Sequence, residues 1–526
     1  MKRPYFFILS ILLVVFWSSC RNDFEFSPST GNLEFARDTV YLDTVFTNIG
    51  SSTYNLKVYN RSNTDIVIPV VQLENGTSSY YRMNIDGSTG LSGDQEGKFF
   101  EDVELLANDS LFIFIETTID IEALSASNTQ FLYTDRILFD TGANQQDVDL
   151  VTLVKDAVFI YPNRDPNTGL FETLTFDADG DGNPDETTLQ GRFLEDSELT
   201  FTNEKPYVIY GYAGVDEGKT LNINAGARVH FHANSGLLIT NMASLKINGA
   251  VSANAEEMEN LVVLEGDRLE PIFTDVPGQW GTIWLFNGSL ENEITYALIK
   301  NATIGVLAEG NQDAPTDKLT ISNTRIYNSS AFGILGRATS ITGENVVINN
   351  SGQSSFAGTF GGKYNLTHCT LANYWNNSFR QLPSVLVNNF LVDENNTVFT
   401  NDLDAANFNN CIIYGNDNPE LLLESEDDSA FNFKFTNCLI RFNNDNLEGT
   451  GNYLFNDPLL FENVIFNQNP DFLDPFENRL IIGSNSAADG AANLTFAQQV
   501  PFDIRNISRT NSPDIGAYQS IIFNED

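Results

Sequence analysis

Basic residues and cysteine are scarce in this sequence. Its 526 residues include 28 lysines and arginines against 70 aspartates and glutamates, which gives a formal net charge of −42. No basic patch is available to follow a phosphate backbone, so we expect no nucleic-acid partner. Only 4 cysteines are present, which limits the number of disulfides. The apolar fraction of 42% is that of a globular protein, and the chain is long enough for several cores.

The N-terminus has the pattern of a secretory signal. Lys2 and Arg3 precede an apolar run from Tyr5 to Trp17, and these 13 residues are too few to span a bilayer. Ser18 and Ser19 then lead to Cys20. The pattern resembles a lipoprotein signal in which Cys20 becomes the acylated first residue, although Trp17 stands where a leucine is usual. An ordinary cleaved signal is the alternative.

The stretch behind the cysteine, residues 21–25, is rich in acidic residues and includes Asp23 and Glu25. It resembles the surface-export signal that Bacteroidota place after the lipidated cysteine. The resemblance implies a lipid-anchored outer-membrane protein that faces the cell exterior.

A column of residues, mostly asparagine, recurs through the second half of the chain. Its members are Tyr296, Asn323, Asn345, His368, Asn389, Asn410, Asn437 and Asn463, at steps of 27, 22, 23, 21, 21, 27 and 26 residues. The residues one and three positions later are apolar or small, as on the inward face of a strand. This period is too short for a propeller blade or a helical pair and predicts a solenoid of strands. Asparagine suits the bend before each strand because it tolerates a left-handed backbone.

These repeats resemble the right-handed parallel β-helix of the pectin-lyase-like superfamily. Residues 218–231 read as a coil, and residues 512–518 (Ser-Pro-Asp-Ile-Gly-Ala-Tyr) resemble the closing phrase of bacterial surface β-helix proteins. The resemblance covers about residues 205–520 and implies a fold, but it implies no activity, because this fold carries lyases, hydrolases, adhesins and inert scaffolds.

Residues 31–156 alternate apolar and polar residues in short runs that turn-forming residues separate, which predicts an antiparallel sandwich. The stretches 45–50 and 55–60 resemble immunoglobulin-like domains of bacterial surface proteins. We therefore expect an all-β chain with these parts: signal peptide 1–19, lipidated tether 20–30, immunoglobulin-like β-sandwich 31–156, connector with a calcium-type loop 157–204, parallel β-helix 205–485, and C-terminal coil and cap 486–526.

A calcium site is predicted in the connector. Oxygen ligands stand at positions one, three, five, seven and nine of a loop with a glycine at position six: Asp177, Asp179, Asp181, Asn183 and Asp185. The loop resembles those of EF-hands and thrombospondin type 3 repeats. Position twelve is Thr188 and no helical pattern flanks the loop, so we expect a structural calcium ion and no EF-hand sensor. A solvated acidic turn is the alternative.

The residues two positions after the asparagine column should point outward. Most are apolar, whereas a catalytic groove would show charge. Leu391, Ile412 and Leu439 are expected on successive coils as a stripe too apolar to stay wet, covered by long loops or by another chain. Cys369, Cys411 and Cys438 share an inner column, so they predict a ladder of buried thiols, with a Cys411–Cys438 disulfide as the alternative.

Three smaller groups of residues carry chemistry of their own. His230 and His232 are expected to face outward as solvated side chains, with metal or substrate binding as the alternative. Trp280 and Trp284 are expected on one strand face, in the core or as a sugar platform. Asp267, Arg268 and Glu270 predict a salt bridge in a loop.

Together these features predict a non-catalytic surface lipoprotein that serves as a binding or scaffold subunit of an outer-membrane protein complex. The machinery that assembles barrels and surface lipoproteins is one host that we consider. The alternative is a cell-surface polysaccharide-binding protein or a polysaccharide lyase or hydrolase. A glycan is therefore a second possible ligand.

Overall fold

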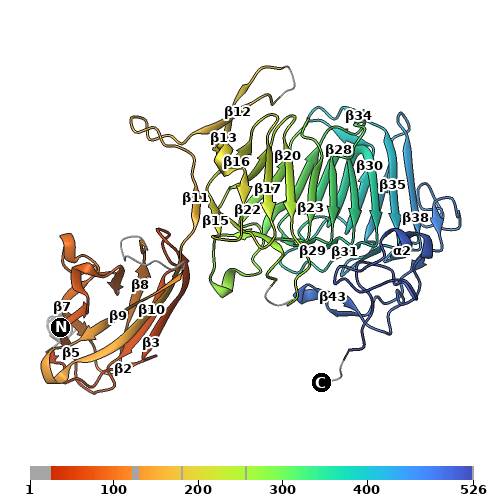
Figure 1. The fold of residues 1–526 in the computed structure, drawn as a ribbon. Coiled ribbons are helices and arrows are strands. Elements are labelled where there is room, and N and C mark those ends of the chain that lie inside the picture. Colours follow the sequence, from red (N-terminus) through yellow and green to blue (C-terminus); the bar gives the residue numbers. More distant parts are fainter. Residues whose placement is uncertain (1–24, 121–129, 179–181, 255–257, 524–526) are drawn as a thin grey trace, which may run out of the picture. The chain divides into compact units, whose positions relative to one another are not determined.

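The computed structural model describes residues 25–120, 130–178, 182–254 and 258–523 (Figure 1). The predicted lipidation at Cys20 lies outside these residues, as do Asp179 and Asp181 of the calcium-type loop. The chain divides into two compact units, residues 1–156 and 157–526. Their regular secondary structure is almost all β, and one α-helix, α2 (Leu494–Gln499), occurs among the described residues. None of the helices described is long and apolar enough to cross a membrane.

The first unit is a sandwich of two sheets. One sheet contains β1 (Ser27–Pro28), β3 (Thr39–Phe46), β5 (Ile66–Leu73), β7 (Phe99–Leu105), β9 (Gln130–Phe139) and β10 (Gln146–Lys155). The other contains β2 (Glu34–Phe35), β4 (Tyr54–Tyr59), β6 (Tyr81–Ile85) and β8 (Ser110–Thr117). Alternate side chains of both sheets form one buried core, as the alternating sequence predicts. The sheets are not purely antiparallel, because β1 pairs with β5 and β10 with β3 in parallel.

The second unit is a solenoid in which most coils add one strand to each of three parallel ladders (Figure 1). The first ladder contains β11 (Val158–Ile160), β15 (Tyr207–Ile209), β18 (Arg228–Phe231), β21 (Val262–Gly266), β24 (Ala297–Lys300), β27 (Arg325–Ser329), β29 (Val347–Ser351), β31 (Thr370–Asn373), β36 (Ile412–Gly415), β39 (Leu439–Ile440) and β41 (Ile465–Phe466).

The second ladder contains β13 (Asp185–Phe193), β16 (Tyr212–Val215), β19 (Gly236–Ile239), β22 (Trp280–Leu285), β25 (Ala302–Glu309), β28 (Phe332–Glu344), β30 (Phe356–Thr367), β32 (Val385–Asn388) and β37 (Leu421–Glu424). The third contains β14 (Thr200–Phe201), β17 (Thr220–Asn224), β20 (Ser244–Asn248), β23 (Asn292–Thr295), β26 (Leu319–Ser322), the second halves of β28 and β30, β35 (Leu403–Asn409), β38 (Phe431–Thr436) and β40 (Phe461–Glu462).

The solenoid begins earlier than the sequence suggested. β11, β13 and β14 lie in the segment expected to be a connector, yet they pair in parallel with β15, β16 and β17 of the next coil. Residues 158–201 thus supply the first coil. β12 (Thr173–Phe176) pairs antiparallel with β13, and the calcium-type loop joins the two strands.

The predicted column of bends is present at seven of its eight positions. These seven residues have φ between 48° and 53°, a left-handed backbone that asparagine adopts at low cost: Tyr296, Asn323, Asn345, His368, Asn410, Asn437 and Asn463. Behind each bend the residues at plus one and plus three point into one core that runs through the solenoid. Cys369, Cys411 and Cys438 are buried free thiols in this core, as the predicted ladder requires.

The C-terminal segment does not form a further coil. No described residue after Phe466 joins the long ladders, and the segment contributes the hairpin of β42 (Phe472–Asp474) and β43 (Arg479–Ile482), the 3-10 helix η7 (Pro475–Glu477) between them, helix α2 and isolated bridges. It returns along the outer face of the first ladder and reaches back to Arg325. This corrects the expectation of a terminal coil for residues 486–526. The aromatic side chains of Phe442, Tyr453, Phe455, Phe461 and Phe466 pack together at the last coils.

Candidate ligand-binding cleft

Two columns of side chains point outward from the first ladder. The pairing register places in the first outward column Arg228, Val263, Leu298, Arg325, Val347, Thr370, Ile412, Leu439 and Ile465. The second outward column, two residues further along each strand, contains His230, Glu265, Lys300, Tyr327, Asn349, Ala372, Tyr414 and Arg441. The spacing of two residues after each asparagine predicts only the first outward column. The second outward column is more polar, and its residues could have been found by reading the sequence four positions after each asparagine.

The apolar part of the first outward column is covered by the chain itself. Ile412 and Leu439 are fully buried, and they pack against Ile482, Ala488 and Ile515 of the C-terminal segment. The sequence predicted that something covers Ile412 and Leu439, and the cover is the C-terminal segment of the same chain. Their assignment as an interface with another protein was therefore wrong. Burial of these side chains removes apolar surface from water, which stabilises the segment on the ladder.

Leu391 does not belong to this column, which corrects its assignment to the stripe. Its strand β33 (Phe390–Val392) pairs antiparallel with β34 (Val398–Thr400) in a local hairpin, and β31 pairs directly with β36. Leu391 is 36% exposed, and Asn389 is absent from the left-handed residues. The hairpin is an insertion in a single coil, and the residues between its strands, Asp393 to Thr397, form a turn in which Asp393 accepts backbone hydrogen bonds.

The asparagine column also holds the C-terminal segment. Side-chain amides donate to backbone oxygens of that segment: Asn345 to Phe502, Asn410 to Asn493 and Asn437 to Ala491, at 2.9, 3.0 and 3.0 Å. Asn349 of the second outward column donates to Pro475 at 2.8 Å. These bonds attach the C-terminal segment to the bends of the ladder, and the Phe502 and Asn493 carbonyls also accept from Arg509 and from the Ala497 amide.

Between this segment and the sheet lies a cleft of about 460 Å³. Its sheet side is formed by β24 and β27, through Leu298, Lys300, Arg325 and Tyr327. The opposite side is formed by residues of the C-terminal segment that include Arg479, Leu480, Arg505 and Tyr518. A concave site of this size, with apolar walls and a few polar groups, is typical of a small-ligand pocket.

The cations of the cleft differ in their partners. Lys300 pairs with Glu265 at 3.0 Å, and Arg505 pairs with Asp503 at 3.2 Å. No ion pair joins Arg325 or Arg479 to a carboxylate within the described parts of the chain. Arg325 donates through Nε to the Tyr518 hydroxyl at 3.3 Å, and no other hydrogen bond of its guanidinium is found among these residues. Arg479 is exposed at the rim.

Next to the cleft, the second outward column forms a charged row. His230 is 5% exposed, with Nδ1 3.7 Å from Glu265 and 3.2 Å from the Gly266 carbonyl, so it is not the solvated side chain expected. Burial alone would raise the pKa of Glu265, but His230, Lys300 and Arg228 hold that pKa below its ordinary value. Glu265 is thus an anion that neutralises its neighbours.

His232 lies beyond the strand end and is half-exposed, as expected for a surface histidine. Its Nδ1 is 2.8 Å from Asp267, and its ring stacks on Tyr210 at 4.3 Å. Arg268 and Glu270 form the predicted local salt bridge at 3.0 Å. No group of three or more residues able to hold a metal ion occurs in the described ranges.

The two tryptophans do not share a face. A register shift between Thr282 and Ile283 in β22 turns the strand, so Trp280 points inward and Trp284 outward. Trp280 stacks on Phe231 at 4.2 Å in the core, and Trp284 Nε1 donates to Glu309 at 2.7 Å. This corrects the expected common face.

The described part of the calcium-type loop is closed by its own carboxylates. Asp177 accepts a hydrogen bond from the Gly182 amide at 3.0 Å, and Asp185 accepts one from the Ala178 amide at 2.9 Å. Asp216 and Glu217 of the next coil line the same hollow as Asp177. Oxygen ligands of this kind suit calcium. The calcium site of Asp177, Asp179, Asp181, Asn183 and Asp185 stays a prediction, because two of these residues lie outside the described ranges.

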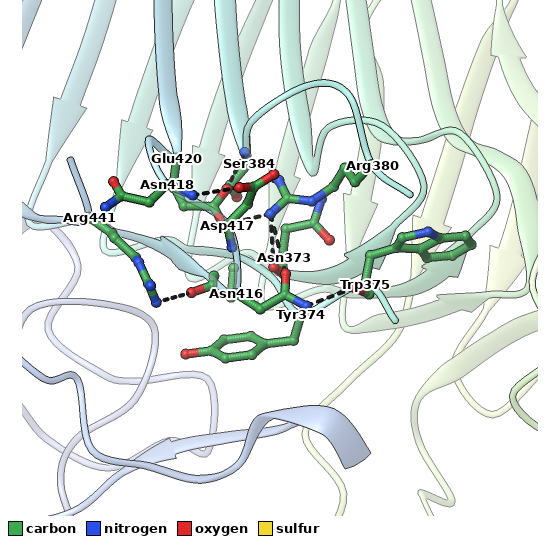
Figure 2. Close-up of polar contacts among 12 residues, drawn as sticks. Asn373, Tyr374, Trp375, Arg380, Ser384, Asn416, Asp417, Asn418, Glu420 and Arg441 are labelled. Atoms are coloured by element: carbon green, nitrogen blue, oxygen red, sulfur yellow. Dashed lines mark hydrogen bonds and ion pairs between the residues drawn. The ribbon is translucent and has the colours of Figure 1, made fainter. Parts of the chain in front are cut away.

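A buried ion pair fixes the long insertion before β32 (Figure 2). Arg380 donates to Glu420 through both terminal nitrogens at 2.8 and 2.6 Å, and both side chains are almost fully buried. Glu420 also accepts the backbone amides of Ser384 and Asp417 at 2.8 and 2.9 Å. All four bonds join groups of the protein to one another, so we assign this pair a structural role.

Comparisons with known proteins give little guidance. No protein-family model matches the sequence, and no curated protein matches it. A family 123 glycoside hydrolase from Clostridium perfringens is similar with a TM-score of 0.16 and 11% identity, over 24% of this chain and 26% of that one. The catalytic unit of a GH87 alpha-1,3-glucanase from Streptomyces thermodiastaticus is similar with a TM-score of 0.19 and 10% identity, over 73% of this chain and 62% of that one. The chain therefore spans less than two thirds of either structure, and neither TM-score supports an argument about function.

Proposed function

We propose that this protein is a non-catalytic ligand-binding lipoprotein of the outer cell surface. The N-terminal pattern supports an acylated Cys20 and export to the surface of an outer membrane. The first unit is then an immunoglobulin-like spacer, and the second a right-handed parallel β-helix of the pectin-lyase-like kind that presents a ligand site. A calcium ion in the loop of Asp177 to Asp185 would brace the first coil.

The cleft between β24, β27 and the C-terminal segment is the observation that carries this proposal. The remainder of the first outward column near the C-terminal segment is sealed by apolar packing, as at Ile412 and Leu439. At Arg325 the segment instead leaves a cleft of about 460 Å³, and the terminal guanidinium nitrogens of Arg325 have no hydrogen-bond partner among the described residues. Leaving donors unpaired at a partly buried site is unfavourable unless water or a ligand satisfies them.

A scaffold role is the second candidate, and a face of the sandwich favours it. Phe112 and Phe114 of β8 point outward, each 39% exposed, with their rings stacked 6.2 Å apart. Lys57 lies over the Phe112 ring at 5.2 Å. Exposed aromatic pairs of this kind are common at protein interfaces. Another outer-membrane protein would be the partner.

An enzyme acting on polysaccharide is the remaining alternative. Two carboxylates, Asp275 and Glu477, line the cleft, and glycoside hydrolysis uses a pair of carboxylates. Asp275 is engaged by the Asn328 amide at 3.0 Å. A lyase or hydrolase would release new chain ends from its substrate, which a binding protein would not.

Affinity electrophoresis of the full chain separates these candidates. The Cys20→Ala protein, which lacks the acylation site, would be run through gels that contain neutral, carboxylated or sulfated polysaccharides. We expect one class to retard the protein without release of reducing ends or unsaturated products. Release of such products would show that the protein is an enzyme and would contradict the proposed non-catalytic binding function. Failure of all classes to retard the protein, together with stoichiometric copurification of a membrane protein with the acylated form, would favour the scaffold.

A further inference from the structure

We propose that the cleft between β24, β27 and the C-terminal segment binds the oxyanion of an acidic saccharide, a sulfate ester or a carboxylate. The saccharide part of this inference rests on the proposed function. The oxyanion part rests on Arg325 and Arg479 alone.

The balance of charge in the cleft differs from that of the chain. Acidic residues outnumber basic ones 70 to 28 in the sequence, yet the cleft is lined by four basic side chains, Lys300, Arg325, Arg479 and Arg505, and by two acidic ones, Asp275 and Glu477. With the partners of Lys300 and Arg505, Glu265 and Asp503, included, the charges at the cleft sum to zero. A cleft without net negative charge repels an anion less than the strongly acidic remainder of the molecule does.

Arg325 is the residue best placed to hold the anion. Its strand β27 is fixed in the ladder between β24 and β29, so the side chain starts from a rigid position. It is half-buried, and Nε is occupied by the Tyr518 hydroxyl. The two terminal nitrogens carry four further N–H groups with no acceptor among the described residues. A planar guanidinium of this kind pairs with carboxylate or sulfate through two parallel hydrogen bonds.

The other cations define where the anion sits. Lys300 and Arg505 are already neutralised by Glu265 and Asp503. Arg479 is exposed at the opposite wall, on β43, and has no ion pair among the described residues. An oxyanion between Arg325 and Arg479 would therefore meet two arginines that have no carboxylate of their own.

The rest of the cleft suits a ring. Leu298 and Leu480 supply apolar wall, and the Tyr327 and Tyr518 phenols stand beside Arg325. A volume of about 460 Å³ lies within the range of small-ligand sites, roughly 300–1,000 Å³. Apolar walls with a few fixed polar groups provide both contact area and orientation.

Isothermal titration of the full chain with the Cys20→Ala change tests the inference. The probes are sulfated, uronate and neutral oligosaccharides of equal length, and inorganic sulfate. We expect at least one acidic oligosaccharide to bind more tightly than the neutral one. Arg325→Gln and Arg479→Gln should each weaken that binding by roughly 10- to 100-fold, because each removes charge-assisted hydrogen bonds. Whichever acidic oligosaccharide binds more tightly identifies the oxyanion.

Arg337→Gln is the matched control, since it removes one positive charge from a surface pair with Glu309 outside the cleft. This control should bind within about 3-fold of the unmodified chain.

Three outcomes would contradict parts of the account. Equal binding of acidic and neutral oligosaccharides overturns the oxyanion inference and leaves the binding function standing. Binding of sulfate that depends on Arg325, without binding of any saccharide, keeps the oxyanion site and overturns the proposed function. No binding of any probe, with unchanged thermal stability of each variant, overturns both.

Discussion

The Nε of Arg325 lies 3.3 Å from the hydroxyl oxygen of Tyr518, although 193 positions separate the two residues in the sequence. The bond joins the middle of the first ladder to the last residues of the chain. It therefore sets one wall of the cleft, and any change that loosens the C-terminal segment should also alter the cleft.

Asn410 should hold that segment more strongly than its backbone role requires. Its amide donates to Asn493 and contacts His368 at 2.9 Å, and its side-chain oxygen accepts the Asn493 amide at 2.7 Å. Asn410→Gly keeps the left-handed backbone but loses these bonds, at a cost of about 1–3 kcal/mol. We expect faster proteolysis of residues 486–523. Asn463→Gly is the control, because Asn463 has the same φ and its side chain has no such bonds among the described residues. Equal proteolysis of the two variants would show that the side chain is not the clamp.

Breaking the buried ion pair should destabilise the solenoid strongly. Glu420→Gln leaves Arg380 charged and buried, which costs about 3–5 kcal/mol of unfolding free energy. Glu462→Gln breaks an exposed pair with Lys434 and should cost at most about 1 kcal/mol. Urea unfolding followed by circular dichroism measures both. A Glu420→Gln protein as stable as the Glu462→Gln protein would contradict this structural role.

His368 should make the stability depend on pH. Burial, together with the charge of Arg509, lowers its pKa to about 3, although the Gly516 carbonyl next to Nδ1 opposes this shift. The Asn410 amide donates to Nε2, which requires a neutral ring. Between pH 6.5 and pH 3 the His368 ring is protonated in the unfolded state but not in the folded state. The contribution of the neutral ring to the free energy of unfolding is therefore complete above pH 6.5 and is lost as the pH falls toward 3.

His368→Asn, the residue most common in this column, should remove that part of the pH dependence. From pH 7 to pH 5 the unmodified chain should lose about 2 kcal/mol more than the variant. Thermal melts at both pH values measure the difference. Identical losses in the two proteins would mean that the ring takes up its proton in the folded state.

The calcium-type loop should depend on its ion. Four aspartates within nine residues repel one another unless a cation lies among them. Saturating calcium should stabilise the first coil by roughly 3 kcal/mol, and a chelator should reverse this. Asp179→Ala with Asp181→Ala should abolish the effect, whereas Asp427→Ala with Asp428→Ala removes equal charge elsewhere. Melting curves insensitive to chelator would reduce the loop to an acidic turn.

The repeated backbone of the solenoid was predictable because it is a local property. Asparagine before a small-x-apolar pattern marks both the bend and the inward face, so Asn345 and Asn437 have the predicted backbone conformation. Asn389 matches the same pattern but does not have the predicted backbone conformation. The strand after it pairs in a hairpin with Val398 to Thr400, which lies close in sequence, instead of joining the ladder. The turn from Asp393 to Thr397 could have indicated that hairpin.

The candidate cleft was not predictable in the same way. Its walls come from strands near residue 300 and from a segment near residue 500, and nothing in the periodicity says where that segment returns. The register shift inside β22 that separates Trp280 from Trp284 is likewise invisible in an alternating pattern. The second outward column was within reach, since Lys300 and Tyr327 each stand four residues after a column member.

Binding of fluorescent acidic polysaccharide to intact cells that produce the full chain tests the central claim most directly. The account predicts labelled cells, loss of cell-bound label with Cys20→Ala and recovery of the binding protein in the medium. Arg479→Glu should abolish labelling at equal surface amounts of protein, while Arg337→Glu should not. Unlabelled cells that display the protein, or equal labelling by the Arg479→Glu chain, would contradict a surface-anchored binding protein with its site in this cleft.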